Sequence, residues 1–379
     1  MTQTRSSWSA RTVAELCKLV TSGGTPSRSN PDFYSQGTIP WVKTGDLHDG
    51  YVIEYDEYVT ESAIQNSSAK VLPEGTVLMA MYGATVGMLG MLAEPAACNQ
   101  AACAMVANPD LCDPRWLFYA LRNDRSRIVS RANGAAQQNL SGTTIKRLAF
   151  LTPDLAQQSA IADVLGALDD KIAINSRIAD SAHALAKAEY ASLMNSTGDT
   201  TTLGELLTLE YGKPLPATSR VPGPVDVFGS GGIVGSHNEA FAAGPGVVVG
   251  RKGTAGAVHW AARHFYPIDT TFYVVPKNAQ VNSLIFCYFL LGSLGLREQN
   301  SDSAVPGLNR NGAHAMEVRL PDAELIRRFT LAAMPLTDLA AQAERESVSL
   351  AAIRDALLPQ LMSGKLRVGD AEKVLEGVL

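Results

Sequence analysis

Two stretches of the chain carry mainly apolar residues at alternating spacings of four and three, the pattern of a helix packed along one seam. Both seams are rich in alanine, so two such helices can approach closely, and Asn175 is a candidate for fixing their register. Two unrelated surface helices, each packed on its own domain, are the alternative. The first series, which only Glu189 spoils, runs through Ile161, Leu165, Leu168, Ile172, Asn175, Ala179, Ala182, Ala186 and Leu193. The second runs through Phe329, Ala333, Leu336, Ala340, Ala343, Ser347, Leu350, Arg354 and Leu361.

The breakers predict that each helix restarts near Ala167 and Pro335 after a short first segment. A run from Ala167 to Asn195 would be roughly 43 Å long at about 1.5 Å per residue, slightly more than one turn of DNA at about 34 Å. Pro335 matches Ala167 in the second series. Because proline lacks a backbone N–H, we expect a kink or a late helix start there.

The segments before the two helices have a different pattern. Short apolar runs such as TVLMAMY, GVVVG and TTFYVV lie between glycine- and proline-rich turns. One helical stretch accompanies them in each segment, around PRWLFYALRND and NSLIFCYFLLGSL. This mixture predicts α+β domains with irregular loops.

An internal repeat relates the two halves. TVAEL returns as TLGEL, GTVLMAMYGATVG as GVVVGRKGTAG, and NLSGTTIKRLAFLTPD as GLNRNGAHAMEVRLPD. The offset shrinks along the first part of each unit and stays constant along the helix. The predicted order is a globule at 1–153, a helix at 154–197, a second globule at 198–321, and a helix with a tail at 322–379.

Composition narrows the class of protein. No window approaches about 18 uninterrupted apolar residues, and the N-terminus lacks the apolar core of a secretory signal, so we expect neither a membrane span nor export. The five cysteines form no CxxC pair, which favours buried thiols in a reducing cytoplasm. The net charge is -5, but both globules hold equal numbers of acidic and basic residues, so either can present a basic face.

Motifs for catalysis are missing. We find no phosphate-binding loop, no HExxH zinc pair and no GxSxG nucleophile elbow. GSGGIVG misses the dinucleotide-binding register at Val234, so a turn or a loop near DNA is the better interpretation. The six histidines lack metal-ligand spacing. We therefore expect no catalytic residues, metal or cofactor in this chain.

With this order of elements the chain resembles a known family, the specificity subunits of type I restriction-modification systems. The resemblance rests on SGGTPSRSNPDFYSQGTIPWVKTGDL, on YGATVG, on NLSGTTIKRLAFLTPDLAQQSAIADVLGALDDKI and on GRKGTAGAVHW. Together with the repeat these phrases cover nearly the whole chain. One departure is that Gln157-Gln158 and Glu324-Leu325 stand where family members often carry a Glu-Gln pair.

The resemblance implies a fold and a set of partners. The fold is α+β: two repeated α/β target recognition globules, each followed by a long helix, with the helices forming an antiparallel coiled coil of pseudo-twofold symmetry. Each globule would recognise one half of a bipartite double-stranded DNA target, and the helices would set the gap. Two modification subunits with S-adenosylmethionine, and restriction subunits with ATP and Mg²⁺, would supply the chemistry in the cytoplasm.

Contact with DNA needs cations for phosphates and planar polar groups for base edges. We choose such residues where glycine allows close backbone approach, although each could equally be an ordinary loop or capping residue. In the first globule they are Thr25, Arg28, Lys43, Thr44, Asp46, Tyr82, Gln137, Gln138 and Asn139. In the second they are Lys213, Ser230, His237, Asn238, Arg251, Lys252, Asn309 and Arg310.

Two other functions compete with DNA recognition. A protein-binding adaptor or decoy of the same complex would have neutral surfaces on both globules. A stand-alone enzyme would need a pocket of titratable groups, which the sequence does not reveal.

Overall fold

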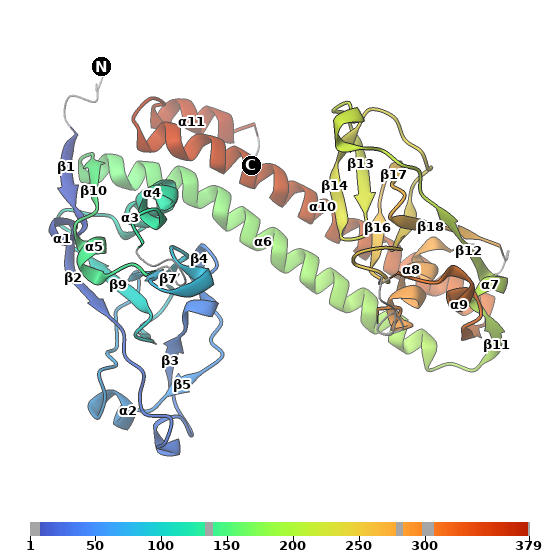
Figure 1. The fold of residues 1–379 in the computed structure, drawn as a ribbon, viewed down its shortest axis with the longest axis horizontal. Coiled ribbons are helices and arrows are strands. Elements are labelled where there is room, and N and C mark those ends of the chain that lie inside the picture. The colour runs from blue at the N-terminus through green and yellow to red at the C-terminus, as the bar shows by residue number, and fades with distance from the viewer. Residues whose placement is uncertain (1–7, 133–138, 278–282, 298–306, 378–379) are drawn as a thin grey trace. The chain divides into compact units, whose positions relative to one another are not determined.

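The computed structural model describes residues 8–132, 139–277, 283–297 and 307–377. The chain divides into two compact units: unit 1 comprises residues 1–173 and 348–379, and unit 2 comprises residues 174–347. Each unit contains one end of both long helices, α6 (Leu155–Met194) and α10 (Ala323–Met362) (Figure 1).

Both long helices span 40 residues and begin close to the predicted bounds of 154 and 322. α6 passes Ala167 and α10 passes Pro335 as single helices, so the restart or late start expected near these positions is wrong. Pro335 removes the helical donor to the carbonyl of Leu331. Leu331 is exposed, so water can bind that carbonyl, which makes the proline tolerable.

The described residues of unit 1 form three sheets. Its strands are β1 (Ser9–Thr12), β2 (Cys17–Ser22), β3 (Ile39–Val42), β4 (Gly50–Val52), β5 (Tyr58–Val59), β6 (Val77–Ala80), β7 (Leu89–Leu92), β8 (Ala97–Cys98), β9 (Ala102–Ala107) and β10 (Ala149–Thr152). Its shorter helices are α1 (Val13–Leu16), α2 (Glu61–Gln65), α3 (Pro114–Asn123), α4 (Arg125–Val129), α5 (Gly142–Lys146) and α11 (Val368–Leu375), with 3-10 turns η2 (Pro31–Phe33), η3 (Thr44–Asp46) and η4 (Gly83–Thr85). The strand orders are β2-β9-β6-β7-β4, β5-β3-β8 and β1-β10.

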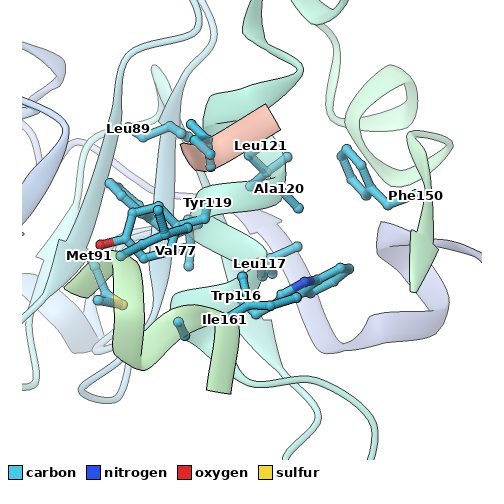
Figure 2. Close-up of a cluster of buried hydrophobic side chains, with 14 of the residues drawn as sticks. Val77, Leu89, Met91, Trp116, Leu117, Tyr119, Ala120, Leu121, Phe150 and Ile161 are labelled. Carbon is cyan, nitrogen blue, oxygen red and sulfur yellow. The ribbon is translucent and has the colours of Figure 1, made fainter. Parts of the chain in front are cut away.

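The central strand β6 is buried on both faces, which explains its continuous apolar run. Successive side chains of a strand point to opposite faces. Val77 and Met79 accordingly join the core that includes α3 and α6, whereas Leu78 packs in a second cluster on the other face. Figure 2 shows Trp116 of α3 beside Ile161 of α6, within the first of these cores.

Unit 2 repeats the sheet organisation of unit 1. Its strands are β11 (Gly198–Thr202), β12 (Leu207–Tyr211), β13 (Val225–Gly229), β14 (Gly232–His237), β15 (Gly246–Gly250), β16 (Val258–Ala261), β17 (Phe265–Pro267), β18 (Thr271–Pro276) and β19 (Glu317–Pro321). Its shorter helices are α7 (Leu203–Leu206), α8 (Leu284–Ser293) and α9 (Arg310–His314), with the 3-10 turn η5 (Ala217–Ser219). The orders β12-β18-β15-β16, β14-β13-β17 and β11-β19 match β2-β9-β6-β7, β5-β3-β8 and β1-β10.

The match extends to single hydrogen bonds. Thr12 and Thr202 each form a capping box with the glutamate three residues later, which starts α1 and α7. The N–H of Val13 donates to Leu148, and that of Leu203 donates to Met316. The prediction of two repeated α/β units, each followed by a long helix, is confirmed.

In unit 2 the two helices run antiparallel over a close-packed alanine layer. Ala179 and Ala182 of α6 pack against Ala340 and Ala343 of α10. The Asn175 side chain is buried at this seam, and its Nδ2 donates to Glu346 Oε2 at 3.0 Å. Small side chains allow the backbones to approach, as the sequence pattern suggests.

Each series of apolar residues contributes to the cores of both units. Phe329 packs in the core of unit 2 with Leu336 at its margin, whereas Leu350 lies in the core of unit 1. The unit 1 core also takes in Ile161, Leu165 and Leu168, with Ile172 packed against it. At the other end of α6, Tyr190 rather than Glu189 continues the series, stacked against Phe289 with ring centroids 5.7 Å apart.

Candidate nucleic-acid interface

The proposed DNA-contact residues of unit 1 fall into two groups, one of which lies where β2 and β6 end. The turn before β9 joins these strand ends, because Gly23 N–H donates to Ala102 and Met81 N–H donates to Ala101. Thr25 Oγ1 donates to Gln100 Oε1 beside this turn, and Tyr82 bridges to Asn139. We call Thr25, Tyr82, Gln100 and Asn139 edge 1.

Unit 2 has the same arrangement where β12 and β15 end. Gly212 N–H donates to Thr271 and Arg251 N–H donates to Thr270, as their counterparts do in unit 1. The N–H of Leu308 then donates to the Arg251 carbonyl, just as Leu140 donates to Met81. We call Tyr211, Lys213, Arg251, Lys252 and Arg310 edge 2.

The loop that follows each central strand is built around a matched glycine. Gly83 has φ of 72° and Gly253 has φ of 76°, a left-handed conformation that side chains disfavour. Immediately before these glycines, Tyr82 bridges to Asn139 and Lys252 bridges to Gly307. Tyr82 and Lys252 therefore occupy matched positions directly before these glycines, one on each edge.

Edge 2 gathers cations around one exposed aromatic ring. The Cζ of Arg251 lies 5.3 Å from the centroid of the Tyr211 ring, and that of Arg310 lies 5.1 Å from it. Arg251 is further held by Nε and Nη2, which donate to the Asp269 carbonyl at 3.0 and 2.6 Å. Lys252 and Lys213 are exposed nearby in the chain.

Edge 1 carries uncharged groups at the matching positions. The matched backbone hydrogen bonds identify Met81 as the counterpart of Arg251 in the repeat, and Tyr82 as the counterpart of Lys252. Ser141 and Asn309 cap the matched helices α5 and α9, so Gly142 corresponds to Arg310. The two edges thus share a backbone frame but differ in charge.

The other group in unit 1 lies around the sheet β5-β3-β8, and its two cations form ion pairs with acidic residues. Arg28 Nη2 lies 2.6 Å from Glu57 Oε2, and its guanidinium packs over Tyr34. Lys43 Nζ lies 3.1 Å from Glu57 Oε1, and the hydrogen bond to Glu57 raises the pKa of Lys43. Glu57 therefore offsets much of the positive charge of Arg28 and Lys43.

Thr44 and Asp46 lie in η3, the 3-10 turn that follows β3. Asp46 Oδ2 accepts a hydrogen bond of 2.8 Å from the Lys43 N–H, which closes this turn. Both side chains are partly exposed. They follow Lys43 of the Lys43–Glu57 ion pair in the chain, and the Asn99 N–H, next to Gln100 of edge 1, donates to the Val42 carbonyl just before them.

Three proposed residues of unit 2 lie on the hairpin of β13 and β14, which GSGGIVG forms. Ser230 is buried, and its hydroxyl donates to the Thr270 carbonyl at 2.7 Å. His237 Nδ1 accepts a hydrogen bond from the Val221 N–H at 3.1 Å. Asn238 is exposed. Of the three, Asn238 has its side chain most accessible to a ligand.

Three further predicted positions complete the set. Asn309 Oδ1 accepts from the N–H groups of Asn311 and Gly312, so it caps α9 and thereby orients Arg310. Gln137 and Gln138 lie outside the described residues. The sequence-based selection missed Tyr211 and Gln100, whose only signal is their place next to Gly212 and before β9.

Metal sites and membrane-spanning helices are both absent from the described residues. No group of three or more His, Cys, Asp or Glu side chains in the described ranges could hold a metal ion. Over the same ranges, no helix is both long and apolar enough to cross a membrane.

Comparisons with known proteins agree on one family. Residues 5–183 match the model of the type I restriction modification DNA specificity domain. The chain is 23% identical over 337 residues to the specificity subunit of the type I restriction enzyme EcoprrI of Escherichia coli, covering 82% of this chain and 83% of that protein. It is also 23% identical over 375 residues to a putative type I specificity subunit of Mycoplasma genitalium, covering 87% and 96%.

Another relative aligns over a shorter stretch, and a solved structure aligns over most of the chain. The specificity subunit of EcoR124I/EcoR124II from Escherichia coli is 23% identical over 164 residues, so the alignment spans only 40% of that relative's length. A crystal structure of the type I restriction-modification S subunit from M. genitalium superposes with a TM-score of 0.70 at 20% identity. It covers 93% of this chain and 96% of that one, which shows that the fold is shared.

Proposed function

The chain belongs to the family of type I restriction-modification specificity subunits, and from that premise we propose that it recognises DNA sequence on behalf of catalytic partner subunits. Unit 1 and unit 2 each bind one part of a bipartite double-stranded target. The chain itself performs no chemistry and needs no cofactor. Two modification subunits carry S-adenosylmethionine, and restriction subunits use ATP and Mg²⁺.

The observation that carries this proposal is the pair of matched edges. A repeated backbone frame that presents different side chains is suited to two different half-sites, because base-edge contacts depend on side-chain chemistry. Edge 2 offers guanidinium and ammonium groups for phosphates and guanines, and edge 1 offers amide and hydroxyl groups. The cations of edge 2 also count against a neutral, protein-only adaptor surface.

The long helices take two further roles in the proposal. They set the gap between the half-sites, and they dock the modification subunits. The alanine layer and the buried Asn175 support the first role, because a close-packed seam with one polar contact resists sliding in register. The assembly acts in the cytoplasm, where the host DNA is.

Mapping of methylated bases tests the function directly. The full chain is co-expressed with the modification subunit of its own system in a host without other such systems, and methylation is mapped across the genome. We expect a two-part motif with a fixed gap that appears only when this chain is present. A stable complex that adds no methylation would instead indicate an adaptor or decoy.

A substitution links the motif to edge 2. Arg251→Gln keeps the polar character but loses the charge and the forked donor set, so one half of the motif should become degenerate or weakly methylated. Arg263→Gln, at an exposed position elsewhere in unit 2, is the matched control. Unchanged methylation of both halves in the Arg251 variant would contradict a role for edge 2 in recognition.

A further inference from the structure

We propose that Tyr211 is a positioning residue that holds Arg251 and Arg310 together as a grip for the DNA phosphate backbone, so that unit 2 supplies the larger electrostatic part of DNA binding. This inference rests on the proposed function and deepens it, because it assigns a ligand chemistry to edge 2. Neither the sequence pattern nor the family match singles out Tyr211.

Two like charges lie against the one ring of Tyr211. Arg251 and Arg310 both lie within 5.3 Å of the Tyr211 centroid, measured from Cζ. A guanidinium is attracted to the face of an aromatic ring, and the attraction offsets part of the repulsion between the two cations. Two arginines gathered in this way form a site for an anion, and phosphate suits the forked donors of arginine.

The described residues supply no carboxylate partner for the cations of edge 2. Within residues 8–132, 139–277, 283–297 and 307–377, no ion pair joins Arg251, Lys252, Arg310 or Lys213 to an acidic side chain. Unit 1 handles its loop cations differently, since Glu57 lies within 3.1 Å of both Arg28 and Lys43. No acidic side chain of the described residues therefore offsets the charge of edge 2.

Tyr211 is anchored against the core of unit 2. Its ring packs on the buried Phe272 with centroids 5.0 Å apart, while 48% of the residue stays exposed. Gly212 follows directly, and a Cβ there would lie 2.2 Å from the Ile268 carbonyl oxygen, so the chain beyond the ring is held against the turn before β18. The ring is thus a fixed support and not a mobile surface side chain.

Edge 1 lacks the charges that edge 2 carries. The positions that match Arg251, Lys252 and Arg310 hold Met81, Tyr82 and Gly142. An uncharged edge gains little from the release of counterions, whereas each neutralised phosphate contributes about 0.9 to the slope of log binding constant against log salt concentration.

The test measures binding of the full chain to a random-sequence DNA duplex over a series of KCl concentrations. Because phosphate contacts are independent of sequence, this assay succeeds or fails independently of the methylation map. Arg251→Gln and Arg310→Gln should each reduce the magnitude of the salt slope by about one. Tyr211→Leu should also reduce it by about one or more, although it removes no charge, and Tyr211→Phe should restore it.

Matched controls separate positioning from folding. Arg263→Gln removes one exposed cation of the same unit and should leave the slope unchanged. Thermal unfolding of Tyr211→Leu and Tyr211→Phe shows whether a change in slope is accompanied by a loss of stability. An unaltered slope in a folded Tyr211→Leu variant would overturn the positioning role. Unaltered slopes in both arginine variants, with loss of binding to a modification subunit, would make edge 2 a protein contact and would also overturn the proposal.

Discussion

Arg354 Nη1 of α10 lies 2.6 Å from Asp169 Oδ1 of α6, and this pair joins the two antiparallel helices within unit 1. Asp169 Oδ2 also accepts a hydrogen bond of 2.7 Å from the Tyr119 hydroxyl of α3, and the same oxygen lies 3.5 Å from Arg122 Nη1. The carboxylate side chain is only 23% exposed. One acidic group therefore ties the α/β part of unit 1 to both of its helix ends.

Loss of this carboxylate should cost stability. Asp169→Ala leaves the largely buried Arg354 guanidinium with only the exposed Asp355 as an acidic partner, and we expect a decrease of about 2 to 4 kcal/mol in the free energy of unfolding. Urea unfolding followed by circular dichroism measures the change. Asp163→Ala on the same helix is the control, since Asp163 is exposed and its pair with Arg115 should contribute less than about 0.5 kcal/mol. Equal losses in the two variants would contradict the central place of Asp169.

The alanine layer in unit 2 should be intolerant of larger side chains. Ala340→Leu adds volume at a fully buried position facing Ala179 and Ala182, and we expect a loss of about 1 to 3 kcal/mol. Ala332→Leu places the same side chain at an exposed position of α10 and should change stability by less than about 0.5 kcal/mol. A neutral Ala340→Leu variant would mean that the seam is loosely packed.

A pair of partly exposed groups gives unit 2 a weak dependence on pH. His183 Nε2 lies 3.3 Å from Glu344 Oε1, and this hydrogen bond, with the nearby Asp180, raises the pKa of His183 above its ordinary value of 6.5. A raised pKa in the folded state means that the stabilisation is fully present below pH 6.5 and is lost as the pH rises through the folded pKa.

Stability measurements at two pH values check this sign. The wild type should exceed His183→Gln in free energy of unfolding at pH 5.5 by no more than about 0.5 kcal/mol, because solvent screens a pair this exposed. The difference should shrink at pH 8.5. A larger difference at the higher pH would show that the proposed protonated pair is wrong.

Insertion of a heptad into both helices tests the proposed gap-setting role. Seven residues added after Ala182 in α6 and seven after Ala340 in α10 preserve the seam pattern and lengthen each helix by about 10 Å. The half-sites should be unchanged in the methylation map, while the gap grows by about three base pairs at about 3.4 Å each. An insertion in α6 alone breaks the pairing and should abolish methylation. An unchanged gap in the double insertion would refute the role.

The helical seam could be predicted from the sequence because its pattern is local. Residues spaced by four and three meet on one face of any α-helix, whatever the rest of the chain does. The two failures on the seam have tertiary causes. Tyr190 displaces Glu189 because Phe289 and Phe329 offer it an aromatic pocket, and Arg354 can be buried at an apolar position because Asp169 pairs with it.

The candidate interface was only partly predictable. Glycine-rich loops pointed to Arg28, Lys43 and Arg251 alike, since all three are cations in similar surroundings along the chain. The structure separates them: Glu57 pairs with the first two, while the Asp269 carbonyl and the Tyr211 ring hold the third. None of these partners can be recognised from spacing.

The repeat, the two long helices and the family therefore follow from the sequence, because periodicity, turn residues and motif order are properties of neighbouring positions. Tertiary structure alone decides which cations are neutralised, which remain available to a ligand, and which ring supports them. The physical reason is that charge pairing and ring stacking join residues that the chain brings together from far apart, as with Asp169 and Arg354, 185 positions from each other.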